Sequence, residues 1–307
     1  MKKFVISVDF GGTNIKLGLV NTSGKIVSRA NLATKNFASN KQKLIRTIVQ
    51  SIDKLIEENR LTKNNILGIG MGLPGLIDPK NGIVLFLPNV PGWRNVPLRN
   101  IMQNATKLPV FIDNDVNVMA LGEWKYGAGK GYQNLICITL GTGVGGGMIL
   151  DNTLYRGEGF AAGEIGHMPL NEKGPVCNCG GEGCFERYVG NQTLQEKAAK
   201  IFKNKAIALE DVFDLAKKDN SRAIQFWEEA AAHIGNALVG VVNLLNPRLI
   251  IIGGGVSNSY QFLGKTIADV IKKRSMKTQA DMVKVVRAKL GNDAALIGAF
   301  VLVKEKF

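Results

Sequence analysis

The chain has 307 residues, 45% of them hydrophobic, and a formal net charge of +14. It is long enough for two packed domains, and no apolar run approaches the roughly 20 residues that a membrane-spanning helix needs. The basic side chains are scattered, so a nucleic-acid role is not favoured, although the charge would suit an anionic nucleotide. Because Asp9 interrupts the apolar N-terminal stretch, we interpret that stretch as a β-strand and not a signal peptide. We therefore expect a cytoplasmic protein without membrane or nucleic-acid partners.

The first half of the chain predicts alternating strands and helices. Strands are expected where short apolar stretches end at turn residues, at 4–9, 15–19, 66–71 and 110–112. Leucines and isoleucines recur at helical spacing over 40–59, which predicts an amphipathic helix, and a second helix is expected over 116–126. Residues 76–100 are rich in proline, asparagine and glycine and are predicted to form a long loop region.

The second half repeats this beginning in outline. A strand, a glycine turn and a returning strand are predicted over 135–150, followed by a loop region over 151–190. The later elements are expected to be helices near 191–203, 208–218, 221–245, 259–274 and 293–304, with strands at 249–252 and 283–288. We expect an N-terminal α/β domain at 1–117 and a C-terminal α/β domain at 118–292. The last helix, about 293–307, could pack back onto the first domain.

Two glycine-threonine turns follow apolar strands, at Asp9-Phe10-Gly11-Gly12-Thr13-Asn14 and at Gly141-Thr142-Gly143. Glycines let backbone N–H groups approach phosphate oxygens, a threonine can add a hydroxyl donor, and Asp9 can hold a hydrated Mg²⁺. Ordinary hairpin turns are the alternative. The second turn also matches G-x-G-x-x-G, but a dinucleotide fingerprint requires a helix after the glycines, and a return strand is predicted there. Together the two turns could grip a polyphosphate from two sides.

A third glycine cluster, Gly253-Gly254-Gly255, follows the apolar strand at 249–252. Glycine permits a close approach of the backbone to a ligand, so the cluster could lie against the adenosine of a nucleotide. A tight strand-to-helix turn explains the same residues equally well.

Three polar residues, Asp113-Asn114-Asp115, stand at the C-terminal end of the strand predicted at 110–112. In open α/β sheets, ligands bind at that edge. A carboxylate there can take a proton from an attacking hydroxyl, and an amide can orient that hydroxyl. Helix N-capping is the alternative, because asparagine and aspartate are preferred caps. A cap needs one such residue, so three leave room for a catalytic role.

Cysteines gather in one short stretch of the chain. Cys177, Cys179 and Cys184 follow His167 closely, whereas Cys137 sits alone in an apolar strand. In a cytosolic chain such clustering favours a metal over a disulfide. One histidine and three cysteines make a complete tetrahedral Zn²⁺ set with no open position, which is typical of a structural site. The spacing is not that of a zinc finger, and reduced thiols in a loop are the alternative.

Taken together, these motifs resemble the ROK family of sugar kinases and repressors from residue 4 to about residue 300. The motifs that carry the resemblance are Asp9-x-Gly11-Gly12-Thr13, Gly72-x-Pro74-Gly75, Asp113-Asn114-Asp115, Leu140-Gly141-Thr142-Gly143-Val144-Gly145-Gly146-Gly147, Glu164-x-Gly166-His167 and Cys177-x-Cys179-Gly180-x-x-Gly183-Cys184-x-Glu186. The resemblance implies the actin-like ATPase fold, with two α/β domains around a cleft. The residues around 88–93 and 157–167 are most similar to the glucokinase branch. Kinases for N-acetylmannosamine, N-acetylglucosamine, allose and fructose share nearly all the same motifs.

The resemblance also implies a role for each matching position. Asp115 resembles the catalytic base that deprotonates the 6-hydroxyl of the sugar. The implied sugar contacts are Gly75, Asn89, Asn114, Asp115, Glu164, His167 and Glu186. The implied ATP and Mg²⁺ site consists of Asp9, Gly11, Gly12, Thr13, Asn14, Thr142, Gly143, Gly254 and Gly255. The implied structural Zn²⁺ ligands are His167, Cys177, Cys179 and Cys184, and the metal would fix the loop that aims His167 and Glu186 at the sugar.

ROK repressors carry a DNA-binding helix-turn-helix module before the kinase-like part. Here the first predicted strand begins at Phe4, so we expect a kinase with a sugar and ATP as its partners, active as a homo-oligomer. A sugar sensor without catalytic activity is the alternative. The expected substrate is a hexose, and the similarity to the glucokinase branch favours glucose.

Overall fold

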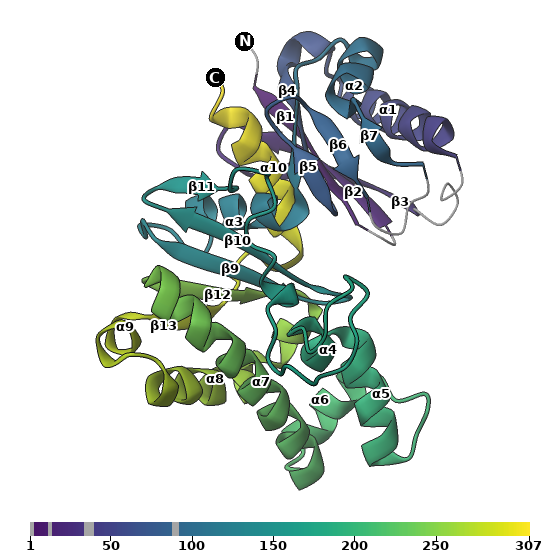
Figure 1. Cartoon of the computed structure of the whole chain (residues 1–307). Helices are drawn as coiled ribbons and strands as arrows, with labels where there is room; N and C mark the ends of the chain where they lie inside the picture. Colours follow the sequence, from purple (N-terminus) through teal and green to yellow (C-terminus); the bar gives the residue numbers. More distant parts are fainter. Residues whose placement is uncertain (1–2, 12–13, 34–39, 88–91) are drawn as a thin grey trace.

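The computed structural model describes residues 3–11, 14–33, 40–87 and 92–307 (Figure 1). Two five-stranded sheets dominate it, and both have the same topology. The first sheet has the order β3 (Ile26–Ala33), β2 (Asn14–Asn21), β1 (Phe4–Phe10), β4 (Ile66–Leu73) and β8 (Val110–Asn114). The second has the order β11 (Thr153–Tyr155), β10 (Val144–Leu150), β9 (Leu135–Leu140), β12 (Leu249–Gly253) and β13 (Lys284–Arg287). In each sheet the first three strands of this order pair antiparallel, and the third, fourth and fifth strands pair parallel. The predicted repeat is therefore confirmed.

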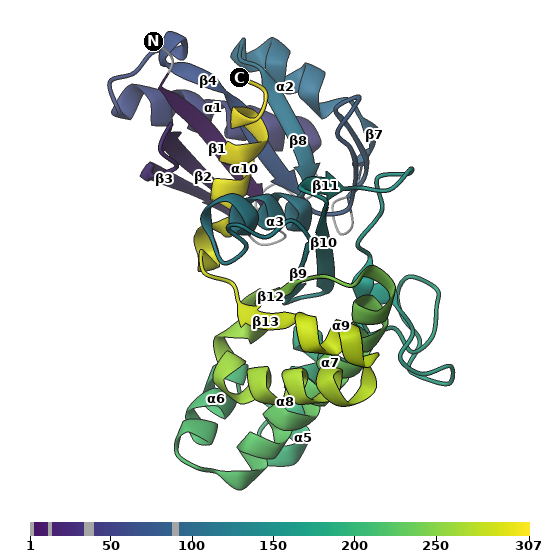
Figure 2. The ribbon, with the colours of Figure 1, turned by 90° about the vertical axis from the view of Figure 1, so that its left-hand side faces the viewer.

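Helices cover both faces of both sheets. The helices α3 (Asp115–Tyr126) and α10 (Ala294–Lys304) lie between the two sheets, where they share one hydrophobic core with both (Figure 2). The outer face of the first sheet packs against α1 (Lys41–Glu58) and α2 (Leu98–Thr106). The outer side of the second sheet carries α4 (Glu186–Val189), α5 (Asn191–Phe202), α6 (Leu209–Lys217), α7 (Ser221–Leu245), α8 (Tyr260–Arg274) and α9 (Lys277–Met282).

Helix α1 shows how local sequence determines these elements. The side chain of Asn40 caps its first turn by accepting a hydrogen bond from the backbone N–H of Lys43 at 2.8 Å. Leu44, Ile48 and Ile52 recur every four residues and are buried against the first sheet. The predicted amphipathic helix is therefore confirmed. Among the described residues, no helix is long and apolar enough to cross a lipid bilayer.

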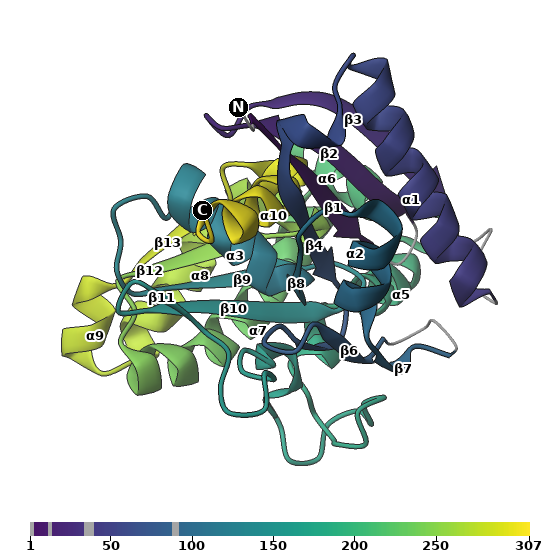
Figure 3. The same ribbon diagram turned by 90° about the horizontal axis from the view of Figure 1, so that it is seen from above.

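The last helix lies on the sheet that begins the chain (Figure 3). It packs against α3 with the two backbones in close contact, because glycines stand at the crossing. A Cβ atom at Gly122 would collide with the carbonyl of Ala294, and one at Gly298 would collide with the carbonyl of Val118. The C-terminal segment thus completes the packing around α3, the helix that begins beside the candidate site.

The prediction of a loop over 76–100 is wrong. This region contains a three-stranded antiparallel sheet of β5 (Leu76–Asp78), β6 (Ile83–Phe86) and β7 (Arg94–Val96), and α2 begins at Leu98. Strands of three or four residues are too short to show a clear period, and the turn residues between them dominate the composition. Strands β3 and β11 and helix α9 were likewise not predicted.

Candidate active site

Acidic residues end two strands of the first sheet at the same edge. In the parallel register, Asp9 of β1 lies opposite Gly72 of β4, and Gly72 lies opposite Asp113 of β8. Chain continuity then places Asp115 at the start of α3, which packs directly over Gly72. The carboxyl ends of these strands therefore bring the predicted acidic residues together, at the edge where open α/β sheets bind ligands.

Asp115 is a half-buried first residue of α3, and its Oδ1 accepts a hydrogen bond from the backbone N–H of Val116 at 2.9 Å. Burial raises the pKa of its carboxyl to about 7, and the carboxylates of Asp9 and Glu164 contribute to the rise. A carboxyl group with a pKa near neutrality suits proton abstraction from a hydroxyl. The predicted base thus lies in an environment that fits the role.

The side chain of Asn114 caps helix α3. Its Oδ1 accepts hydrogen bonds from the backbone N–H groups of Val116 and Asn117 at 2.9 and 3.2 Å. Its Nδ2 donates to the carbonyl of Gly75 at 3.1 Å, and Gly75 has a φ of +90°, which favours glycine. The capping alternative is confirmed for this position, and the amide also fixes the loop that follows β4. Its contact with a sugar remains a prediction.

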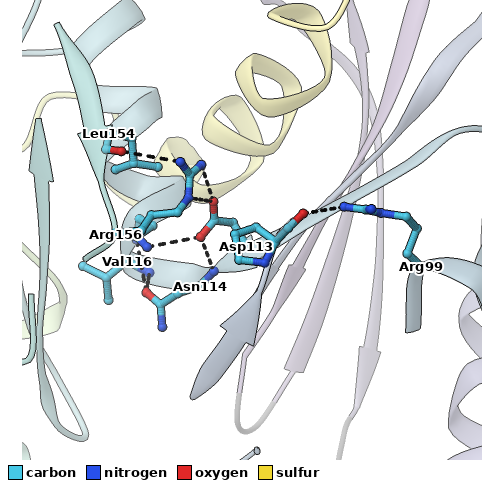
Figure 4. A network of polar contacts seen from close by, with 8 residues as sticks. Arg99, Asp113, Asn114, Val116, Leu154 and Arg156 are labelled. Carbon is cyan, nitrogen blue, oxygen red and sulfur yellow. Dashed lines mark hydrogen bonds and ion pairs between the residues drawn. The ribbon is translucent and has the colours of Figure 1, made fainter. Parts of the chain in front are cut away.

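Asp113 pairs with Arg156, a residue that the sequence analysis did not identify (Figure 4). Oδ2 of Asp113 lies 2.6 Å from Nη2 and 2.8 Å from Nε of Arg156, and the Asp113 side chain is 2% exposed. Nothing in the sequence around Arg156 distinguishes it from other surface arginines, because its partner lies 43 residues away.

The four predicted metal ligands come together. The ligand atoms of His167, Cys177, Cys179 and Cys184 all lie within 4.8 Å of one another. The Sγ atoms of Cys179 and Cys184 are 3.6 Å apart, close to the separation of about 3.8 Å expected for two sulfurs on a tetrahedral Zn²⁺ with bonds of about 2.3 Å. The donor set and its spacing therefore fit a closed structural zinc site.

His167 presents its two ring nitrogens to different neighbours. Nδ1 lies 3.7 Å from Sγ of Cys177, on the side of the cysteine cluster. Nε2 lies 4.0 Å from Oε2 of Glu164, whose side chain is more than half exposed. The histidine can thus bind a metal with one nitrogen while the other remains available beside Glu164.

Glu186 contacts the second glycine turn. Its Oε2 accepts a hydrogen bond from the backbone N–H of Val144 at 2.8 Å, and a Cβ atom at Gly143 would meet the same oxygen. The sequence analysis connected Glu186 with the sugar alone. The structure adds a contact with the turn that contains Thr142, whose side chain is exposed.

The first glycine turn lies next to Asp9. The backbone N–H of Gly11 donates to the carbonyl of Asn14 at 3.0 Å, and Asn14 is exposed. Burial raises the pKa of the Asp9 carboxyl, while Lys16, 3.5 Å away, opposes the rise. The predicted site residues Gly12, Thr13 and Asn89 lie outside the described residues.

The third glycine cluster borders a pocket of about 150 Å³. Gly254 has a φ of +80°, and a Cβ atom there would collide with the backbone of Leu140, so this position requires glycine. Gly255 lines the pocket together with Asn191 and Trp227. Oδ1 of Asn191 and Nε1 of Trp227 are buried without a hydrogen-bond partner in the described structure. The pocket therefore borders two buried polar groups without partners, and the sequence analysis identified neither residue.

The chain matches the model of the ROK family over residues 5–306. It is 37% identical to a glucokinase of Halalkalibacterium halodurans, over 99% of this chain and 96% of the relative. It is 34% identical to a xylose repressor of Caldicellulosiruptor bescii, over 97% of this chain and 77% of the repressor. A crystal structure of a ROK family glucokinase from Streptomyces griseus, in complex with glucose and AMPPNP, superimposes with a TM-score of 0.83 at 31% identity, over 98% of this chain and 99% of that one.

The fold and the sequence agree on the identification. The duplicated sheets with two helices between them form the actin-like ATPase fold. The match to the family model covers nearly the whole chain. The chain therefore belongs to the ROK family.

Proposed function

We propose that this protein is an ATP-dependent kinase that phosphorylates the 6-hydroxyl of a hexose, with glucose as the favoured substrate. The proposal rests on Asp115, which lies at the same edge of the first sheet as Asp9. The pKa of the Asp115 carboxyl is raised to about 7 there. A general base with such a pKa is matched to deprotonation of a hydroxyl at neutral pH. The relatives that are glucokinases support the choice of sugar.

On the sugar side, Asp115 would accept the proton of the attacking hydroxyl. Glu164 and His167 would hydrogen-bond other hydroxyls, since the charge of Glu164 acts on the base and Nε2 of His167 lies 4.0 Å from Oε2 of Glu164. The remaining proposed sugar contacts are Gly75, Asn89, Asn114 and Glu186. The enzyme has little covalent work to do, because phosphoryl transfer depends mainly on alignment and on charge stabilisation.

On the nucleotide side, the two glycine turns would bind the phosphates, and the pocket beside Gly255 would take the adenine ring. The lining of the pocket supports this. Gly255 has no side chain and permits a close approach, and the aromatic side chains of Phe213 and Trp227 can pack against a planar base. The proposed positions are Asp9, Gly11, Gly12, Thr13, Asn14, Thr142, Gly143, Gly254 and Gly255. Closure of the proposed domains, 1–117 and 118–292, would exclude water from the transfer.

Two metal ions fit the donor groups that are present. Asp9 would hold Mg²⁺, which when bound neutralises charge on the phosphates. The repulsion between the carboxylates of Asp9 and Asp115 favours a cation near them. His167 and the three cysteines would hold a structural Zn²⁺. With Nδ1 held by the cysteine cluster, the His167 ring is oriented so that Nε2 faces the sugar side.

A sugar-responsive regulator is the second candidate, because the chain is 34% identical to a xylose repressor. The two candidates predict different behaviour toward ATP. A kinase releases ADP when the sugar is added, whereas a regulator binds a sugar without ATP turnover. We further propose that the protein works in the cytoplasm as a homo-oligomer and does not require nucleic acid.

The test is a coupled ADP-release assay of the purified protein over glucose, fructose, allose, xylose, N-acetylglucosamine and N-acetylmannosamine. We expect kcat/KM for glucose to exceed that for the N-acetylhexosamines by at least roughly 10²-fold, because a site built to hydrogen-bond a hydroxyl rejects analogues that leave its polar groups unpaired. A preference for an N-acetylhexosamine would refute glucose as the favoured substrate but would leave the proposed kinase activity intact. Binding of a sugar without ADP release would refute the kinase and favour the regulator.

A further inference from the structure

The carboxylate of Asp113 uses both of its oxygens although its side chain is only 2% exposed. Oδ1 accepts hydrogen bonds from the backbone N–H of Asn114 at 2.8 Å and from Nδ2 of Asn117 at 3.1 Å. Oδ2 accepts a hydrogen bond from Nε of Arg156 at 2.8 Å and forms an ion pair with Nη2 of the same arginine at 2.6 Å. One oxygen therefore binds the first turn of α3, and the other binds an arginine from a different part of the chain.

Arg156 begins the segment that leads to Glu164 and His167. It follows directly after β11, and its carbonyl accepts a hydrogen bond from the backbone N–H of Ala162 at 3.0 Å. The far end of the segment is also fixed, because Gly163 packs against the backbone of Gly146 in β10 so closely that a Cβ atom would collide there. The segment is thus attached to the second sheet at Gly163. It is attached to the first sheet through the pairing of Arg156 with Asp113 (Figure 4).

We propose that Asp113 and Arg156 are positioning residues that fix the proposed base, Asp115, relative to the proposed sugar contacts Glu164 and His167. This inference rests on the proposed function of the same site. Asp113 reaches the base through the first turn of α3, and Arg156 reaches the sugar contacts through residues 156–167. Neither residue needs to touch the substrate.

The chemistry of the pair suits this task. A guanidinium donates from a rigid planar fork, so it fixes direction as well as distance, and it remains charged at every relevant pH. Because Asp113 is buried, removing one partner leaves an uncompensated charge in place of the pair. An error of about 1 Å in the placement of reacting groups can lower a rate about 10²-fold. The ion pair therefore controls the geometry of catalysis.

The test compares Arg156→Gln, Arg156→Lys, Asp113→Asn and the double variant Asp113→Asn/Arg156→Gln with the wild type. Lysine keeps the charge but lacks the fork, whereas the double variant removes both charges and leaves two amides that can pair. Arg29→Gln is the matched control. Arg29 also binds an aspartate with two nitrogens, Asp293 at 2.6 and 2.9 Å, but at an exposed place, and it makes no hydrogen bond to those site residues that the structure describes.

For Arg156→Gln we expect kcat/KM for the sugar to fall about 10²-fold, with both kcat and the sugar KM affected, while the KM for ATP stays at its wild-type value. Arg156→Lys should recover part of the loss, and the double variant should be less impaired than the product of the single losses. Arg29→Gln should behave like the wild type.

Three results would overturn the inference: unchanged sugar kinetics in folded Arg156→Gln, an equal rise in the KM for ATP, or losses that multiply in the double variant. If Arg156→Gln does not fold, Arg156→Lys and the double variant decide the same question. A wild type that phosphorylates no sugar would refute the proposed function instead. The positioning inference would then be judged by calorimetric sugar affinity, which Arg156→Gln should lower and Arg29→Gln should not.

Discussion

Glu186 and Val144 connect two parts of the candidate site that lie 42 residues apart in the chain. The carboxylate Oε2 of Glu186 accepts a hydrogen bond of 2.8 Å from the backbone N–H of Val144, at the end of the second glycine turn. Glu186 itself begins α4, two residues after the proposed zinc ligand Cys184. We therefore expect a shift of the cysteine loop to move the turn proposed to bind phosphate.

This contact predicts different effects for two substitutions of Glu186. Glu186→Ala removes the acceptor for the Val144 N–H and should raise both the ATP KM and the sugar KM. Glu186→Gln keeps an acceptor, so the ATP KM should stay close to its wild-type value while the sugar KM rises. A hydrogen bond to a charged group contributes about 1.5–3 kcal/mol, which corresponds to roughly 10- to 10²-fold in an affinity.

Initial-rate kinetics with each substrate varied in turn would measure these constants. Glu196→Gln is the control, because Glu196 lies on the exposed face of α5, where it pairs with Gln192. Equal ATP constants for the alanine and glutamine variants would exclude the proposed role of the Val144 contact.

Asp115→Asn should lower kcat by about 10²–10⁴-fold, the usual contribution of a general base, with sugar binding largely retained. The amide fills the same space but cannot accept the proton. Steady-state kinetics and calorimetric titration with glucose would separate the two effects. Turnover at the wild-type rate would remove Asp115 from the mechanism.

The wild-type pH profile should show the ionisation of Asp115. Burial and the charges of Asp9 and Glu164 raise the pKa of its carboxyl to about 7. Since only the carboxylate accepts a proton, log kcat/KM should rise with a slope of about one below pH 7 and level off above it. The direction follows from the raised pKa: lowering the pH protonates the base and removes activity.

The kinetics should be measured from pH 5.5 to 8.5 at constant ionic strength, with protein stability checked at each pH. Glu164→Gln removes one of the charges that raise the pKa, so it should move the acidic limb to lower pH. A profile that is flat through pH 6 would contradict the assigned ionisation.

The purified protein should contain about one zinc per chain, because the described ligands form one complete set of four. Cys179→Ser should lose the metal and raise the sugar KM, since the loop that carries His167 loses its anchor. Cys137→Ala is the control: Cys137 is fully buried in β9 and belongs to a different core, so its zinc content should be unchanged. Elemental analysis would measure the metal, and zinc-free active wild type would contradict the assignment.

Features that depend on nearby residues can be predicted from the sequence. The helix over 40–59 and the strands at 4–9 and 110–112 follow from the spacing of apolar residues, and each is present in the structure. The glycine turns could be placed because they follow apolar strands directly. The three cysteines within residues 177–184 indicate a metal set from the sequence alone, since a short loop brings such ligands together readily.

Contacts between groups that are distant in the chain become visible only in the folded structure. The pairing of Asp113 with Arg156 and the contact of Glu186 with Val144 depend on how the two sheets and their loops pack, and no local pattern in the chain contains that information. The same holds for Asn191 and Trp227, which lie on two different helices and line one pocket.

Residues 76–100 illustrate the converse. Their short strands are stabilised by burial of Trp93 and Val96 against the core of the first sheet, and this burial outweighs a local composition typical of loops.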